Sequence, residues 1–185
     1  MRVRRWHITE ITKELVLERL LKAHEVWFDV SRNHEFAGKV FPGYAEFHSH
    51  GEQYVLVKRA KLWEVNTHEY LFFMLQEHLD EATLQDYVEF MKEKAPAKVV
   101  LEPDHMSSFL SLVIIADSVD PSVERTVRRI RYRKNFKLGF RGWADLRLAV
   151  VDVANKAVYT NPMGKELKAT LEANLTSEPS KDIES

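Results

Sequence analysis

The sequence predicts an α+β protein in which a single, mostly antiparallel β-sheet is packed with about four helices. Apolar residues recur at helical spacing near both ends of the chain and again between them. Segments rich in Val, Ile, Leu, Phe and Tyr occupy much of the remainder and favour strands. The chain has 185 residues, 45% of them hydrophobic and 30% charged. This is a globular composition, and a chain of this length can bury about 70% of its unfolded surface.

A long amphipathic helix is expected from Thr9 to Asp29. Two apolar rows, one beginning at Val16 and one at Leu17, repeat at intervals of three and four residues and form a wide apolar face. Charged residues fill the other positions. We interpret the helix as packing on the core of the protein. The alternative is that its apolar face docks a partner or a second copy of the chain.

The next part of the chain is dominated by β-forming residues. Phe41-Pro42-Gly43 indicates a turn. After this turn, strands are expected at Tyr44–His50, Tyr54–Val65 and Glu69–Leu75.

Two helices are marked by the residues at their ends. The segment Glu81–Lys94 follows Asp80, which is a suitable N-cap, and ends before Pro96. Another helix begins at Asp120-Pro121, because Asp caps helices and Pro is tolerated in their first turn. In this second helix Val123, Val127 and Ile130 are expected to face inward, and Arg125, Arg128 and Arg129 outward.

The later strands differ in character. Ser107–Ala116 is the most apolar segment and predicts a strand covered on both faces. In Phe136–Arg141, Phe and Leu alternate with Lys, Gly and Arg, which predicts a strand with one cationic face and its aromatic residues in the core. The remaining elements are a strand at Leu146–Val150, a turn at Asn155-Lys156, a short strand at Val158-Tyr159 and a last helix opened by Asn161-Pro162.

We expect one globular domain over residues 1–175 and a polar, disordered tail over 176–185. The sequence has neither the apolar core of a signal peptide nor a run long enough to span a bilayer, so a soluble, cytoplasmic protein without a membrane partner is expected. There is no cysteine, which excludes disulfides, thiolate zinc sites and cysteine nucleophiles. No cofactor is predicted, and the oligomeric state is left open.

The distribution of charge is the most informative feature of the sequence. The chain has 27 Lys+Arg against 28 Asp+Glu, a net charge of −1, but one window holds eight basic residues and no acidic one. The remainder, with 19 basic and 28 acidic residues, carries −9. Such a basic surface attracts nucleic acid or another acidic partner, whereas the alternative is a solvated or internally paired surface. The eight residues are Arg125, Arg128, Arg129, Arg131, Arg133, Lys134, Lys137 and Arg141.

A second candidate site consists of Glu46, His48 and His50. On a strand these residues share one face, and two imidazoles with a carboxylate form a common ligand set for catalytic zinc or iron. This set supports an alternative function as a metal-dependent hydrolase or nuclease-like enzyme. The residues that follow do not continue the metal motifs of cupins, JAMM peptidases or metallo-β-lactamases. We therefore interpret the three residues as an exposed strand face and predict no metal.

Other catalytic patterns are missing from the sequence. It has no Gly-x-Ser-x-Gly, no Walker loop and no Gly-x-Gly-x-x-Gly. Asp117 could join Glu46 and Glu64 in a nuclease-like carboxylate set, but we interpret it as a turn or capping residue before the helix at Asp120. Ser, His and Asp residues are present, yet no motif places them together. The sequence favours a protein without catalytic activity and leaves the question open.

Several strings from about Phe36 to Leu167 resemble a family of uncharacterised bacterial proteins that is defined only as a domain of unknown function. The resemblance implies no substrate, cofactor or catalytic residue. The strings are Leu62-Trp63-Glu64-Val65, His68-Glu69-Tyr70-Leu71-Phe72-Phe73, Asp104-His105-Met106, Ile115-Ala116-Asp117-Ser118, Gly142-Trp143-Ala144-Asp145, Val151-Asp152 and Thr160-Asn161.

The sequence thus favours a non-catalytic binding module that uses its basic surface for nucleic acid or another acidic macromolecule. Two alternatives stay open: the metal-dependent enzyme, and a protein-interaction subunit or homo-oligomer formed through the N-terminal helix.

Overall fold

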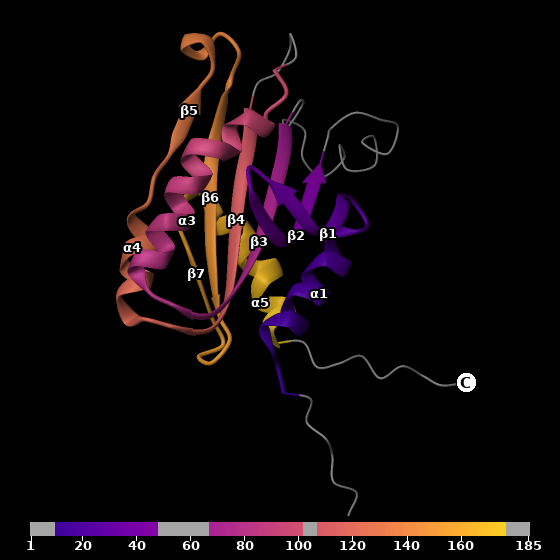
Figure 1. The fold of residues 1–185 in the computed structure, drawn as a ribbon, viewed down its shortest axis with the longest axis vertical. Helices are drawn as coiled ribbons and strands as arrows, with labels where there is room; N and C mark the ends of the chain where they lie inside the picture. Colours follow the sequence, from indigo (N-terminus) through magenta and orange to yellow (C-terminus); the bar gives the residue numbers. More distant parts are fainter. Residues whose placement is uncertain (1–9, 48–66, 102–106, 177–185) are drawn as a thin grey trace, which may run out of the picture.

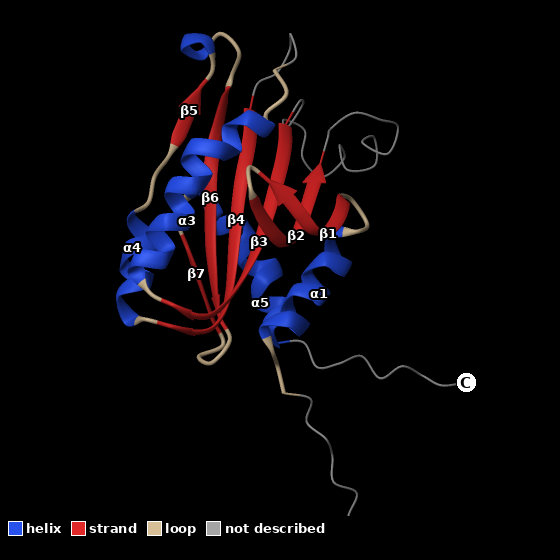
Figure 2. Cartoon of the chain, in the orientation of Figure 1, coloured by secondary structure: helices blue, strands red, loops and turns tan. Residues whose placement is uncertain are grey.

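The computed structural model describes residues 10–47, 67–101 and 107–176, which form a seven-stranded β-sheet with helices on both faces (Figures 1 and 2). The strands are β1 (Asp29–Phe36), β2 (Lys39–Phe47), β3 (Thr67–Leu79), β4 (Ser107–Val119), β5 (Arg133–Asn135), β6 (Trp143–Asp152) and β7 (Ala157–Thr160). The α-helices are α1 (Lys13–His24), α3 (Glu81–Lys94), α4 (Pro121–Arg129) and α5 (Lys168–Thr176). The short 3₁₀ helices are η1 (Ala95–Lys98), η2 (Lys137–Gly139) and η3 (Met163–Leu167).

The sheet is mixed. Its strand order is β1-β2-β3-β4-β6-β5, and β7 pairs with β6 beyond the end of β5. Among the described strands four pairings are antiparallel, but the central strands β3, β4 and β6 are parallel. Parallel neighbours need a crossover, and the segments containing α3 and α4 supply the two crossovers. The predicted α+β class is confirmed, and the sheet is more extensive than the sequence indicated.

Helices cover the sheet on both faces. Residues of α3 and α4 share one core with Leu112 and Ile114 of β4, while residues of α1 and α5 share another with Val113 and Ile115. These four strand residues are at most 1% exposed, which confirms the prediction of a strand covered on both faces. The apolar face of α1 lies in the second of these cores. Within the described residues, no helix has the length and apolar character needed to cross a bilayer.

The N-terminal helix is shorter than predicted. Thr12 caps it, because its side chain accepts a hydrogen bond of 3.2 Å from the Leu15 amide. The helix ends at His24, whose carbonyl accepts hydrogen bonds from the amides of both Trp27 and Phe28. Beyond this turn the chain enters β1, which pairs with β2. The apolar spacing thus continues past the helix into a turn.

The predicted turn at Phe41-Pro42-Gly43 was wrong, because these residues lie inside β2. The hairpin turn comes earlier, at Ala37 and Gly38, which have φ angles of 50° and 78°. Pro42 is tolerated because the β2–β3 pairing begins only at Gly43 and the β1–β2 register omits Pro42, so its missing amide hydrogen interrupts no pair. Gly43 packs closely against α1, since an added Cβ would lie 2.9 Å from a methyl group of Leu21, whose side chain would have to shift.

The helix Glu81–Lys94 was predicted with its observed ends. Asp80 caps it, accepting a hydrogen bond of 2.7 Å from the Thr83 amide. The predicted strand Tyr54–Val65 and the tail from residue 177 onward lie outside the described residues.

Candidate functional site

Three of the eight predicted cations lie on the solvent side of α4. The inward positions of this helix are held by Val123 and Val127, both 0% exposed, so Arg125, Arg128 and Arg129 face outward as predicted. Arg128 also pairs with Glu124 one turn earlier, Nη2 to Oε1 at 2.7 Å. This exposed pair contributes only a few tenths of a kcal/mol, about 0.3–0.5.

Arg133 on the edge strand β5 has a structural partner. Its Nε and Nη2 each lie 2.7 Å from an oxygen of Asp145 on β6, whose side chain is only 5% exposed. The guanidinium also lies 5.1 Å from the ring centroid of Trp143. The hydrogen bond to Asp145 raises the pKa of Arg133 above its ordinary value. Arg133 therefore holds β5 against β6 and contributes little free positive charge.

Residues 136–142 form a protruding turn between β5 and β6, which corrects the prediction of a strand over Phe136–Arg141 (Figures 1 and 2). Lys137, Leu138 and Gly139 have φ angles of 46°, 57° and 91°, and these left-handed residues cannot continue a strand. Phe136 packs against the core as predicted. Leu138 and Phe140 were expected there as well, but they are 95% and 88% exposed. Glycines three residues apart, Gly139 and Gly142, were the available signal for a turn.

The seven predicted cations other than Arg133 differ in their contacts. Arg131 donates hydrogen bonds to the carbonyls of Arg128 and Ile130, and Arg141 is partly buried. Four cations are exposed and have no ion pair or side-chain hydrogen bond within the described part of the chain, and they define what we call the basic edge: Arg125, Arg129, Lys134 and Lys137. Figure 1 shows the elements that carry these four residues, α4, β5 and the turn that follows β5, on the same side of the fold.

Of the three predicted metal ligands, only Glu46 lies within the described residues. Glu46 lies near the end of β2, where its carboxylate accepts a hydrogen bond of 2.6 Å from the Tyr44 hydroxyl and lies 3.6 Å from the Lys98 ammonium. Burial and this hydrogen bond raise the pKa of Tyr44 well above its ordinary value. His48 and His50 lie outside the described residues. Among the residues that are described, no group of three or more potential ligands is placed to hold a metal ion.

Asp117 is a strand residue, not the predicted turn or capping residue. β4 continues to Val119 because that residue still pairs with Leu79 of β3. The Asp117 carboxylate forms an ion pair with Lys13 at the start of α1, and this hydrogen bond is the main cause that raises the pKa of Lys13. Glu64, the other member of the carboxylate set, lies outside the described residues.

A Ser–His–Asp chain of contacts was missed by the sequence analysis. His78 Nδ1 lies 2.8 Å from Ser118 Oγ, and Nε2 lies 3.1 Å from Asp120 Oδ1. The parallel register of β3 and β4 pairs His78 with Ser118, forty residues away. Catalysis by such a triad requires a preorganised site from which water is excluded, whereas the His78 side chain is 55% exposed. We interpret these contacts as a tie between β3 and the start of α4.

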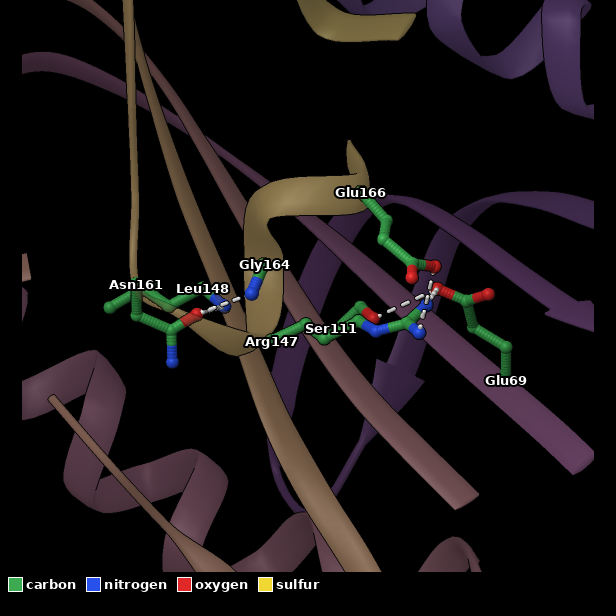
Figure 3. A network of polar contacts seen from close by, with 7 residues as sticks. All are labelled: Glu69, Ser111, Arg147, Leu148, Asn161, Gly164 and Glu166. Atoms are coloured by element: carbon green, nitrogen blue, oxygen red, sulfur yellow. Dashed lines mark hydrogen bonds and ion pairs between the residues drawn. The ribbon is translucent and has the colours of Figure 1, made fainter. Parts of the chain in front are cut away.

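A partly buried polar network crosses the three parallel strands (Figure 3). The guanidinium of Arg147 on β6 lies 3.2 Å from Glu69 on β3 and 3.4 Å from Glu166 on η3. Its Cζ lies 3.3 Å from the ring centroid of Phe109. Ser111 on β4 donates a hydrogen bond of 3.0 Å to the Glu69 carboxylate. The Arg147 side chain is 8% exposed, and the two carboxylates balance its buried charge. Its Nε is buried and has no hydrogen-bond partner among the described residues.

Asn161 holds η3 in the position that this network needs (Figure 3). Its Oδ1 accepts hydrogen bonds from the amides of Leu148, at 2.9 Å, and Gly164, at 2.8 Å, while Nδ2 donates to the Leu146 carbonyl at 2.9 Å. Gly164 allows this close approach, because an added Cβ would lie 2.6 Å from the Leu148 carbonyl oxygen. A charged residue inside an apolar strand was the sequence signal for this network.

Comparison with known families identifies the chain. A family model described as Domain of unknown function (DUF8052) matches residues 12–173. The chain belongs to this family. The DUF8052 match confirms the predicted resemblance and extends it towards the N-terminus, so that it includes α1, all seven described strands and the basic edge. No curated protein and no solved structure matches the chain.

Proposed function

We propose that this protein is a non-catalytic binding module that holds a polyanion along its basic edge. One observation carries the proposal: Arg125, Arg129, Lys134 and Lys137 are exposed and have no ion pair among the described residues. They belong to α4, β5 and η2, and Figure 1 shows these elements on the same side of the fold. Cations that pair within the fold lose most of their attraction for a ligand. These four retain their charge for an external anion.

The negative charge of the rest of the chain favours binding of a polyanion at the basic edge over binding elsewhere. Outside the basic window the chain carries −9, which repels a polyanion from other surfaces. In physiological salt, charges are screened over about 8 Å, so a ligand senses the local surface more than the net charge of −1. A chain of phosphates or carboxylates lying along the basic edge would also release its condensed counterions, which favours binding.

One residue of the basic edge, Lys134, also has a role that involves no ligand. Lysine on an exposed edge strand discourages pairing with the edges of other sheets, and Lys134 lies on β5, the edge strand beside β6. This role does not extend to Arg125 and Arg129, which lie on a helix, or to Lys137 in the tip. The proposal therefore depends most on these three residues.

The two alternative functions have less support. The metal-dependent hydrolase needs the carboxylate of Glu46, which already contacts Tyr44 and Lys98. A partner or second copy docked on the apolar face of α1 would have to displace the core contacts of Leu20 and Leu21, both 0% exposed.

A charge-reversal experiment tests the proposal. A labelled single-stranded oligonucleotide serves as a generic polyanion, and its fluorescence anisotropy reports binding. Replacing the four residues of the basic edge with Glu should weaken binding by about tenfold or more. The control replaces four exposed lysines elsewhere with Glu and changes the net charge equally: Lys22, Lys156, Lys165 and Lys168. Equal losses in both variants, or no binding by the unmodified protein, would refute the proposal.

A further inference from the structure

The tip between β5 and β6 exposes the two large apolar side chains that are most accessible in the described part of the chain. Leu138 is 95% exposed and Phe140 is 88% exposed. The next most exposed are Val26, at 66%, and Val40, at 54%. Single apolar residues at a surface are ordinary. Two nearly fully exposed apolar residues in one protruding turn instead form a small exposed apolar patch.

The tip is a defined turn whose backbone is extensively hydrogen-bonded. The Phe136 carbonyl accepts hydrogen bonds from the amides of Gly139, at 2.9 Å, and Arg141, at 3.3 Å, and the Phe136 amide donates to the Gly142 carbonyl at 3.0 Å. Leu138 adopts φ 57° and ψ 27°, a left-handed conformation that bulky residues rarely take. Such a backbone occurs where the surrounding structure enforces it, and it is often found at ligand clamps. The tip therefore presents its apolar residues in a set geometry.

Cations accompany these apolar residues. Lys137 lies within the tip, and Lys134 precedes it on β5. Both are exposed and have no ion pair among the described residues. A ligand that fits this tip must offer an apolar region for Leu138 and Phe140 together with negative groups around it.

We propose that the tip docks on an anionic lipid surface, with Leu138 and Phe140 inserted at the boundary between headgroups and acyl chains. Lys134 and Lys137 would then contact the phosphates of the headgroups. This inference rests on the proposed function and names the class of its polyanion. A single-stranded nucleic acid would satisfy the two lysines and stack on Phe140, but it has no apolar region for Leu138. The sequence-based expectation of no membrane partner considered only segments that span a bilayer, and a docked tip needs none.

Vesicle sedimentation tests the inference with phosphatidylcholine vesicles, with and without phosphatidylglycerol. The full chain should bind the vesicles that contain phosphatidylglycerol and not those of phosphatidylcholine alone. The variant Leu138→Ser/Phe140→Ser should bind on the order of 100-fold more weakly, because it loses two inserting side chains. Since both residues are solvent-exposed, these substitutions leave the core of the fold unchanged.

Matched controls separate the contribution of the apolar tip from that of its lysines. Val26→Ser/Trp27→Ser removes another exposed apolar pair, at 66% and 51%, and should leave vesicle binding unchanged. Reversal of Lys134 and Lys137 to Glu should reduce vesicle binding more than reversal of Arg125 and Arg129, which lie on α4 far from the tip (Figure 1).

The two proposals fail in distinguishable ways. Unchanged vesicle binding by the Leu138→Ser/Phe140→Ser variant, or no vesicle binding while the oligonucleotide still binds, would overturn the lipid inference and leave the proposed function intact. An oligonucleotide affinity that falls with Phe140→Ser but not with Leu138→Ser would assign the tip to nucleic acid instead. Absence of binding to both probes would overturn both proposals.

Discussion

Arg133 and Asp145 join the edge strand β5 to β6 through two parallel hydrogen bonds, each of 2.7 Å. The pair is asymmetric, since the Arg133 side chain is 52% exposed and the Asp145 side chain 5%. The buried carboxylate therefore depends on one arginine of the basic window for its charge balance. This relationship distinguishes a cation that stabilises the fold from the four cations of the basic edge, which are exposed and have no ion pair among the described residues.

Arg133→Ala should destabilise the protein by about 1–3 kcal/mol, because it leaves a buried carboxylate without its partner. Lys134→Ala, one residue later on the same exposed strand, should change the free energy of unfolding by less than about 0.5 kcal/mol. Urea unfolding of both variants measures the difference. Equal effects would contradict a structural role for Arg133.

The Arg147–Glu69 pair should behave as a coupled unit. Arg147→Met leaves the partly buried Glu69 carboxylate, and Glu69→Leu leaves the buried Arg147 guanidinium, with an incomplete set of partners. Each should cost about 3 kcal/mol. The double variant should be more stable than the sum of the two losses predicts, by about 1 kcal/mol or more. A double-mutant cycle of urea unfolding checks this. Additive losses would show that the two side chains act independently.

Asn161→Ala should cost about 3 kcal/mol or more, because the amides of Leu148 and Gly164 and the carbonyl of Leu146 would lose their partner in a buried site. The control is Asn174→Ala, since Asn174 donates only an exposed hydrogen bond to the Thr170 carbonyl and should lose less than about 0.5 kcal/mol. The unfolding free energies of the two variants are compared. Similar values would refute the role of Asn161 in holding η3.

His34 should make stability depend on pH. Burial is the largest cause that lowers its pKa, and the charge of Lys98 adds to it, while Glu46 opposes both. The unfolded chain therefore takes up a proton more readily than the folded one. The stability from His34 is fully present above the unfolded pKa of about 6.5 and is lost as the pH falls towards the lower folded pKa.

The variant His34→Phe tests this dependence and retains the ring that stacks on Tyr44, whose centroid lies 3.9 Å from that of His34. Between about pH 8 and about pH 5 the unmodified protein should lose more unfolding free energy than His34→Phe. Equal losses of unfolding free energy in the two proteins would show that the pKa of His34 is not lowered by folding.

Local signals in the sequence were sufficient for some elements. The helix Glu81–Lys94 was predicted with its ends, because Asp80 caps it and Pro96 follows it. Local signals misled where tertiary context overrides them. Pro42 suggested a turn but lies in β2, outside the pairing with β3, and the alternation in Phe136–Arg141 suggested a strand where left-handed residues form the tip.

The contacts that join distant residues were not predictable from local patterns. Arg147 meets Glu69 only because β3, β4 and β6 are parallel neighbours. That order follows from two crossovers rather than from any short motif. The same holds for His78 and Ser118. The cations of the basic window, in contrast, could be named from the sequence, because charge is read directly from composition. Their division into paired and unpaired residues required the structure.

The dependence of polyanion binding on salt tests the central claim most directly. If the four cations of the basic edge contact about four phosphates of a single-stranded oligonucleotide, the logarithm of the association constant should fall with the logarithm of salt concentration at a slope near −2.8. Replacing Arg125, Arg129, Lys134 and Lys137 with Glu should bring that slope towards zero. A slope near zero for the unmodified protein, or the same slope in both proteins, would contradict the account.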